Sequence, residues 1–421
     1  MTSDSPAVYV WTWLPGATKP VVAGRLDPAG NVLAFTYGQS YLAREDAIPL
    51  YLPELPLGEN QTVPLTTGDA AGAITDAAPD AWGQRVILNR VVGRAADDTP
   101  TLDLTTYLLE SGSNRVGALD FQRSPTDYIP RSTGAATLAE LIESAERVEQ
   151  GVPLSEALDQ ALLHGTSVGG ARPKATLTDG SRELIAKFSS STDPYSVVKG
   201  EFVAMTLARR AGLDVAPVEL RRSGNKDVLL VERFDRPAEG GRQAMVSALT
   251  ILELAEHEAR YASYADLAEI VRGRFTEPQP TLRELFSRIT FNILTGNTDD
   301  HARNHAAFWD GQSLSLTLTP AYDICPQGRT GQTAKQVMDI GTDGYRDSQL
   351  AGCVERATTY GLTPIKAREL VDRQIEVIRK DWDEVSDQAS LTKVDRGFFW
   401  KRQFLNPYAF YGYDAPAQTP P

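Results

Sequence analysis

The sequence predicts an α+β protein with a β-rich N-terminal part, a strand-rich middle part and a mainly helical C-terminal part. Short runs of β-branched and aromatic residues dominate residues 1–125, and further runs surround one helical stretch in residues 165–237. From Val246 onward, apolar residues recur at the three- and four-residue spacing of helices. A chain of 421 residues exceeds one ordinary hydrophobic core, so we expect two or three domains.

Composition narrows the class of function. The chain has 55 acidic and 42 basic residues, and its net charge of −13 disfavours sequence-independent DNA binding because phosphate repulsion is not compensated. Two cysteines, Cys325 and Cys353, are too few for a disulfide framework or a cysteine-based zinc site and fit a reducing compartment. We see no signal peptide and no apolar run approaching about 18 residues, so we expect a cytoplasmic protein without membrane contact.

Residues 1–125 are predicted to form a small α+β domain without residues suited to chemistry. Its predicted strands are Val8–Trp13, Val21–Leu26, Asn31–Tyr37 and Val116–Phe121, and its predicted helices are Asp80–Arg90 and Leu102–Leu109. Residues 126–164 follow as a linker and two helices, Leu138–Glu149 and Leu154–His164.

A loop of small residues, 165–174 (GTSVGGARPK), opens the middle part. Small residues let backbone N–H groups approach an anion, and Lys174 adds positive charge. The spacing is not that of a Walker P-loop. Taken alone, the loop is more simply a tight hairpin without a ligand.

Two charged residues follow this loop. A predicted strand over Glu183–Phe188 carries Lys187 inside an apolar run, and a predicted helix over Val197–Ala211 carries Glu201 beside its apolar face. Each residue taken alone is more simply solvated, but in a phosphate site Glu201 could pair with Lys187. Further strands are predicted over Leu213–Leu220 and Asp227–Phe234, and the second ends where a nucleotide-binding interpretation places the adenine hinge.

Residues 238–405 are predicted to form a helical lobe organised around 297–305 (NTDDHARNH). A helix over Thr281–Leu294 precedes this segment, with Pro280 before it and a capping box made by Thr281 and Glu284. A hairpin over 306–318 follows it and leads to Asp323. A long helix is predicted over Pro364–Val385, and residues 406–421 are predicted to form a surface tail.

The order of these residues matches a phosphoryl-transfer site. Such a site needs one carboxylate to orient a hydroxyl, then an amide and a second carboxylate to hold Mg²⁺. Asp299, Asn304 five residues later, and Asp323 supply these groups in that order. Lys187 would neutralise the α- and β-phosphates, and Glu201 would orient Lys187.

This segment has three other interpretations. Asp300 is an alternative base, but only Asp299 has the five-residue offset to Asn304. His301 and His305 invite a metal-hydrolase interpretation, although the segment is predicted to be a loop, so helical spacing does not apply. We therefore expect His301 to hold the loop by hydrogen bonds. A plain polar turn fits the composition but does not explain the phosphotransfer offsets.

Together these residues resemble the HipA-type toxins, serine/threonine protein kinases of bacterial type II toxin–antitoxin modules. The resemblance covers nearly the whole chain. Its motifs are SVGGARPK at 167–174, VERFDR at 231–236, NTDDHARN at 297–304 and TPAYD at 319–323, with looser matches at APDAWG, 78–83, and VGAL, 116–119. It implies a two-lobed, protein-kinase-like fold with a small β-rich N-terminal subdomain, a nucleotide-binding small lobe over 165–237 and a helical catalytic lobe.

The resemblance also implies roles for individual residues. Asp299 matches the catalytic Asp, Lys187 the ATP-binding Lys, and Asn304 and Asp323 the Mg²⁺ pair. The other residues that it assigns to the nucleotide site are Val168, Gly169, Gly170, Ala171, Lys174, Glu232, Phe234 and His301. Ser167 matches the serine whose autophosphorylation inactivates the family's kinases, and a phosphate there would add about −2 charge beside the nucleotide.

The family's partners are implied in the same way. Members are held by a dimeric helix-turn-helix antitoxin (HipB-like) and reach DNA only through it. Their substrates are aminoacyl-tRNA synthetases, glutamyl-type in the best-known case, and the outcome is growth arrest and persistence. The acidic composition agrees with a kinase that does not bind DNA itself.

The sequence departs from the family pattern at two places. Asp300 stands where a Gly is usual, and Arg172-Pro173 replaces the usual Gln-Glu, so Pro173 removes one backbone donor from the loop. Neither change removes a required group, and we expect an active kinase. The alternatives are a kinase-fold phosphotransferase for a small molecule or lipid, and a catalytically weak nucleotide-binding scaffold.

Overall fold

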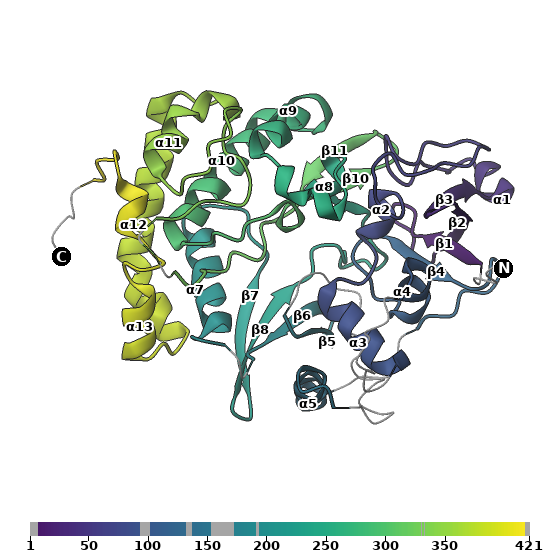
Figure 1. Cartoon of the computed structure of the whole chain (residues 1–421), viewed down its shortest axis with the longest axis horizontal. Helices are drawn as coiled ribbons and strands as arrows, with labels where there is room; N and C mark the ends of the chain where they lie inside the picture. The colour runs from purple at the N-terminus through teal and green to yellow at the C-terminus, as the bar shows by residue number, and fades with distance from the viewer. Residues whose placement is uncertain are drawn as a thin grey trace.

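The computed structural model confirms the α+β prediction and has three small antiparallel sheets in its described part (Figure 1). It describes residues 7–92, 102–131, 137–152, 172–190, 193–329, 331 and 333–416. In Figure 1 the N-terminal sheet lies at one end of the molecule, the helices α11 to α13 lie at the other, and the middle sheet lies between them. None of the described helices is long and apolar enough to cross a bilayer.

The N-terminal sheet has the strand order β3-β2-β1-β4. Its strands are β1 (Val8–Thr12), β2 (Val21–Ala29), β3 (Val32–Tyr37) and β4 (Leu119–Gln122), and its helices are α1 (Gln39–Leu42), α2 (Gly72–Thr75), α3 (Ala81–Val92) and α4 (Leu104–Glu110). The three predicted N-terminal strands are confirmed. The fourth begins at Leu119 instead of Val116, because the chain turns at Gly117 with φ of 72°.

The middle sheet has the order β5-β6-β8-β7. Its strands are β5 (Lys174–Asp179), β6 (Arg182–Phe188), β7 (Val218–Ser223) and β8 (Lys226–Glu232), and the helices α5 (Leu138–Glu149) and α7 (Val197–Arg210) accompany it. Alternate residues of β6 and β8 pack on opposite sides: Ala186 and Leu230 join a cluster with Trp82 and α5, whereas Leu229 joins α7. The predicted helix Leu154–His164 lies outside the described residues.

The C-terminal part combines a sheet of order β11-β10-β9 with helices. Its strands are β9 (Met245–Ser247), β10 (Ala306–Asp310) and β11 (Ser315–Leu318). Its α-helices are α8 (Ala248–Ile251), α9 (Tyr264–Arg274), α10 (Pro278–Thr295), α11 (Leu350–Glu355), α12 (Pro364–Gln388) and α13 (Lys393–Phe399). Short 3-10 turns are η1 (Glu256–Tyr261), η2 (Ala302–Asn304), η3 (Ala357–Tyr360) and η4 (Pro407–Phe410).

Helix α10 begins earlier than the sequence predicts. Its N-cap is Glu277 and Pro278 is its first residue, so the predicted capping box of Thr281 and Glu284 is wrong. Prolines fit the first turn because its N–H groups have no partner within the helix. Thr281 is buried inside the helix, and Glu284 instead accepts a hydrogen bond from Arg288 at 2.9 Å.

Helix α12 is confirmed and extends to Gln388. Its predicted apolar face is buried against the core (Val371, Ile375, Ile378 and Trp382). The described part of the predicted surface tail packs on this helix. Tyr413 is 4% exposed, and its hydroxyl donates to Asp372 at 2.7 Å.

Candidate active site

Lys187 lies at the centre of the candidate site. Its neighbours on β6, Ala186 and Phe188, are buried on the face toward α5, so Lys187 faces the other side. Its ammonium donates to Glu201 Oε1 at 2.6 Å and to Asp323 Oδ1 at 2.5 Å. The ion pair expected between Lys187 and Glu201 is present, and it ties the middle sheet to α7 and to the segment after β11.

Burial and charge act in opposite directions on the pKa values of this group. Burial lowers the pKa of Lys187, but Asp323 and Glu201 outweigh it and raise that pKa. Burial favours the neutral form of Asp323, yet Lys187 lowers its pKa to about 2. Burial raises the pKa of Glu201. At neutral pH Lys187 is therefore protonated and Asp323 is ionised.

Lys174 lies opposite Lys187 on the neighbouring strand β5 and is 2% exposed. Its ammonium donates to Asp80 Oδ2 at 3.2 Å, and its carbonyl oxygen accepts from Trp82 Nε1 at 3.1 Å. Burial, together with the nearby charge of Lys187, lowers the pKa of Lys174. The start of α3 in the N-terminal part thus holds a lysine beside the site, a contact that the sequence did not reveal.

Gly296 delivers the segment 297–305 from the end of α10. Its φ of 71° is left-handed, and a Cβ there would lie 2.9 Å from the backbone Cα of Gln403. Both constraints require glycine at this position. The chain then continues through η2 into β10, so the segment is a loop, as the sequence predicts.

Asp299 and Asn304 occupy this loop in different environments. Asp299 is exposed, whereas Asn304 is 7% exposed. Asn304 Nδ2 donates to the Asp299 carbonyl at 3.3 Å, which fixes the orientation of the amide. Partial desolvation, assisted by the charges of Asp323 and Asp300, raises the pKa of the Asp299 carboxyl.

Asp323 has a left-handed backbone with φ of 60°, a conformation that costs a non-glycine residue roughly 1–2 kcal/mol. Its neighbours hold it there. Ala321 forms a parallel bridge with Val215, and the Tyr322 hydroxyl donates to the Arg303 carbonyl at 2.7 Å. Backbone strain of this kind persists only where the surrounding structure holds it, and it is found most often at functional sites.

The donor set fits Mg²⁺. Amide and carboxylate oxygens are the hard ligands that Mg²⁺ prefers, and the cation is commonly held by one or two protein groups together with phosphates. The amide nitrogen of Asn304 is engaged, which leaves its oxygen as the ligand, and Asp323 is ionised. Within the described ranges, no group of three or more His, Cys, Asp or Glu side chains is arranged to hold a metal ion.

Asp300, which the sequence left unexplained, points into the protein. Its carboxylate is buried, and Oδ2 accepts from the Tyr264 hydroxyl, from Asn292 Nδ2 at 2.7 Å and from His305 Nε2 at 3.0 Å. Burial alone would raise its pKa, but His305 and Tyr264 bring the pKa below its usual value. The carboxylate is buried and held through Oδ2, so it is not accessible to a substrate.

His301 does not make the hydrogen bonds that we expected of it. Among the described residues its ring has no hydrogen-bond partner, and only its backbone carbonyl accepts, from Asn304 N–H at 2.8 Å. The nearby His301 ring acts to lower the pKa of the Asp299 carboxyl, so the ring lies close to the site. The histidine that holds the loop is His305. Sequence spacing did not distinguish the two because it does not show which ring faces inward.

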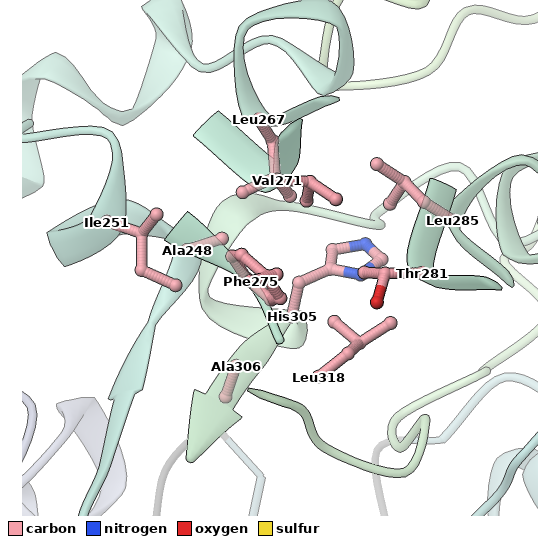
Figure 2. Close-up of a pocket in the computed structure, with 10 residues that line it drawn as sticks. All are labelled: Ala248, Ile251, Leu267, Val271, Phe275, Thr281, Leu285, His305, Ala306 and Leu318. Atoms are coloured by element: carbon pink, nitrogen blue, oxygen red, sulfur yellow. The ribbon is translucent and has the colours of Figure 1, made fainter. Parts of the chain in front are cut away.

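A small apolar cavity of about 10 Å³ lies behind the loop (Figure 2). Figure 2 shows the His305 ring directed between Thr281 and Leu285. Among the described residues, His305 Nδ1 is buried without a hydrogen-bond partner. A space of this size holds about one water molecule, so it is not a nucleotide site.

The predicted hinge lies at the end of β8. The Glu232 N–H donates to the Pro217 carbonyl at 2.9 Å, so only its carbonyl could meet an adenine. The Phe234 ring lies 5.7 Å from the Tyr322 ring and 5.8 Å from the Phe308 ring. Phe234 therefore links the hinge to the segment that carries Asp323.

Buried charges join this hinge to the N-terminal part. Asp235 pairs with Arg233 and Arg236, both at 2.8 Å, and Asp235 Oδ2 accepts from Gly117 N–H at 2.8 Å. The same arginines donate to the Asn114 side chain at 2.9 and 3.0 Å. Asp235 has a pKa well below its usual value because the two arginines outweigh its burial.

Residues 165–171 of the small-residue loop fall outside the described residues, and with them the predicted nucleotide contacts Val168, Gly169, Gly170 and Ala171 and the predicted phosphorylation site Ser167. At its described end, Arg172 pairs with Asp193, with one N–O distance of 3.0 Å. Sequence reasoning also missed Asp80, Tyr264 and Asn292. Asp80 lies in the motif at 78–83, to which no role was assigned, and Tyr264 and Asn292 lie in stretches of helical pattern in which nothing marks a site.

Residues 166–382, just over half of the chain, match the model of the HipA-like C-terminal domain. The chain therefore belongs to the HipA family. The recognition made from the sequence motifs is confirmed, and the matched residues include Lys187, Asp299 and Asp323.

Relatives and solved structures agree with the HipA assignment. The putative kinase Y4mE of Sinorhizobium fredii is 26% identical over 404 residues, which is 84% of this chain and 88% of that protein. The serine/threonine-protein kinase toxin HipA of Shewanella oneidensis is 27% identical over 188 residues, 38% of this chain and 42% of that protein. A solved complex of the Shewanella oneidensis MR-1 HipA with HipB and operator DNA matches with a TM-score of 0.69 at 20% identity, covering 95% of this chain and 97% of that one. The HipA-like, kinase-like fold is thus confirmed.

Proposed function

We propose that this HipA-family protein is an ATP-dependent serine/threonine protein kinase and the toxin of a toxin–antitoxin module. The observation that carries the proposal is the position of Lys187, whose ammonium contacts Glu201 and Asp323 from different parts of the chain. A lysine held in this way supplies positive charge for phosphates next to an ionised carboxylate. The names of the relatives as kinases support the same activity.

In the proposed reaction, Asp299 accepts the proton of a serine or threonine hydroxyl. The hydroxyl oxygen bonds to the γ-phosphorus of ATP, and the bond from that phosphorus to the β–γ bridging oxygen breaks, giving a phosphoprotein and ADP. The raised pKa of Asp299 suits a group that takes up a proton. Lys187 and Lys174 neutralise the phosphates, and Glu232 and Phe234 contact the adenine through the main chain. Mg²⁺, held by Asn304 and Asp323, would screen the charge that develops on the phosphates.

The partners and substrate belong to the same proposal. The solved HipA relative is in complex with HipB and operator DNA. We propose a helix-turn-helix antitoxin dimer as the partner, with DNA reached only through it, in agreement with the net charge of −13. We further propose an aminoacyl-tRNA synthetase as substrate, glutamyl-type first, and inactivating autophosphorylation at Ser167.

The test compares the wild type with Asp299→Ala and Asp323→Ala, using labelled ATP with Mg²⁺ and cell lysate, and growth after expression. We expect a labelled protein band and growth arrest for the wild type only. Asp383→Ala, an exposed residue on α12 whose side chain is 88% exposed, is the matched control and should behave as the wild type. Label on a small metabolite, or arrest by both site variants, would overturn the proposal.

A further inference from the structure

Asp300 gathers three hydrogen bonds on one buried oxygen. The donors come from α9 (Tyr264), from α10 (Asn292) and from the residue before β10 (His305). All four residues are at most 3% exposed. A carboxylate that has lost its water needs such donors, so its position is fixed by the three elements that supply them.

The contacts continue from Asp300 to the backbone of Asp323. Asn292 donates to Asp300 through Nδ2 and accepts through Oδ1 from Asn297 Nδ2 at 3.1 Å. Asn297 Nδ2 also lies 3.4 Å from the Asp323 carbonyl oxygen, a long contact. The side chains of Asp300, Asn292 and Asn297 thus form one buried chain, which we call the Asp300 network.

The Asp300 network lies directly behind the predicted catalytic groups. Asp300 follows Asp299 directly in the chain. The Asp300 side chain is buried and the Asp299 side chain is exposed, so the two side chains point to opposite sides of the backbone. The far end of the network reaches Asp323, whose left-handed backbone needs support. Groups that must stay within a fraction of an ångström of one another are commonly held by buried polar contacts of this kind.

We propose that the Asp300 network positions Asp299 and Asp323 relative to one another for phosphoryl transfer. Asp300, Asn292 and Asn297 are positioning residues, and Tyr264 and His305 fix the Asp300 end. This inference rests on the proposed function. It gives a role to the carboxylate that stands where the family pattern has a Gly.

A purely structural role would produce a different result. If the network only stabilised the fold, its loss would lower the melting temperature, while the folded fraction would keep its kcat. Gln374→Leu provides that comparison. Gln374 is 2% exposed, accepts from Thr290 Oγ1 and donates to the Ser287 carbonyl, both at 2.9 Å, on another side of α10.

The experiment uses the full chain with Asp300→Ala, Asp300→Asn and the milder Tyr264→Phe, which removes one hydroxyl. We measure kcat, the KM for ATP, the melting temperature and amide hydrogen exchange of residues 297–305. We expect kcat to fall about 10- to 100-fold for Asp300→Ala, with the KM for ATP within about threefold and faster exchange of that segment. Tyr264→Phe should give the same changes to a smaller extent. Gln374→Leu should lower the melting temperature alone.

A double-mutant cycle between Asp300→Asn and Asn297→Ala tests the connection itself. Residues joined by one network give non-additive effects on kcat and on exchange, whereas independent residues give additive effects. Additive effects, or an unchanged kcat in folded Tyr264→Phe and Asp300→Asn, would overturn the inference. If the wild type transfers no phosphate, the proposed function fails. In that case, amide hydrogen exchange of residues 297–305 and the Mg²⁺-dependent affinity for ATP test the positioning role of the Asp300 network without a kinase assay. If both quantities were the same in the variants as in the wild type, the positioning role would be refuted.

Discussion

The ammonium of Lys187 lies 2.5 Å from Asp323 Oδ1 and, in the same position, 2.6 Å from Glu201 Oε1. One cation therefore satisfies two carboxylates that come from different parts of the chain. Asp323 is predicted to hold Mg²⁺ and Glu201 to orient Lys187. The contact therefore couples formation of the site to the packing of α7 against the middle sheet.

Replacing Lys187 should weaken nucleotide binding and leave Glu201 without its cation. For Lys187→Met we expect Mg²⁺·ATP affinity to fall about 10- to 100-fold, since one charge-assisted contact to phosphate is lost. Lys226→Met, on the neighbouring strand β8, removes a lysine that pairs with Glu146 at 3.0 Å and should leave the affinity unchanged. Calorimetric titration measures both, and equal affinities for the wild type and Lys187→Met would contradict this role.

Through its contact with Lys174, Asp80 of the N-terminal part should affect the binding of ATP at the site. Asp80→Asn keeps the cap of α3, where Asp80 Oδ1 accepts from Gly83 N–H at 2.9 Å, but removes the charge that holds Lys174. We expect the KM for ATP to rise about three- to tenfold, with kcat within about twofold. Exposed Asp69→Asn serves as the control in the same steady-state assay. A rise in both variants would show that general loss of acidic charge, not the Lys174 contact, is responsible.

The sequence predicted the elements of this fold better than it predicted their contacts. The spacing of apolar residues predicted β6, α7 and α12 correctly. Each of these elements buries one face, and burial of one face is what produces a regular spacing of apolar residues. The spacing did not find the cap of α10, because prolines in a first turn look like a boundary. At the site, the order of the predicted strand and helix correctly suggested that Lys187 pairs with Glu201. The five-residue offset from Asp299 to Asn304 could not show that Asp300 faces inward, because the side chains of adjacent loop residues have no fixed direction.

The buried charges at the hinge should make stability depend on Asp235. Its pKa is below the usual value when folded, so its contribution is present above the unfolded pKa of about 4 and is lost as pH falls toward the lower folded value. Asp235→Asn leaves Arg233 and Arg236 buried without a carboxylate, which typically costs about 3–5 kcal/mol. Urea unfolding at pH 7 and at pH 3 checks this. We expect the difference between wild type and variant to shrink at the lower pH, and a difference that grew there would contradict the assignment.

Gly296 should control both stability and activity, because it aims the loop that carries Asp299. An alanine there meets left-handed strain of about 1–2 kcal/mol and also a Cβ contact at 2.9 Å with the backbone of Gln403. Gly344 separates the two effects. Its φ of 75° is also left-handed, but nothing lies within 4 Å of a Cβ there. Gly344→Ala should therefore lose only the strain energy and keep full kcat.

Gly296→Ala should lose more unfolding free energy than Gly344→Ala, because the backbone of Gln403 cannot move away as a flexible side chain could. The displaced loop should also lower kcat, by about 100-fold if Asp299 moves by about an ångström. Denaturant unfolding and the kinase assay, run on both variants, measure the two effects. If the two alanines cost the same stability and Gly296→Ala kept its kcat, the approach of Gly296 to Gln403 would not be what positions the loop that carries Asp299.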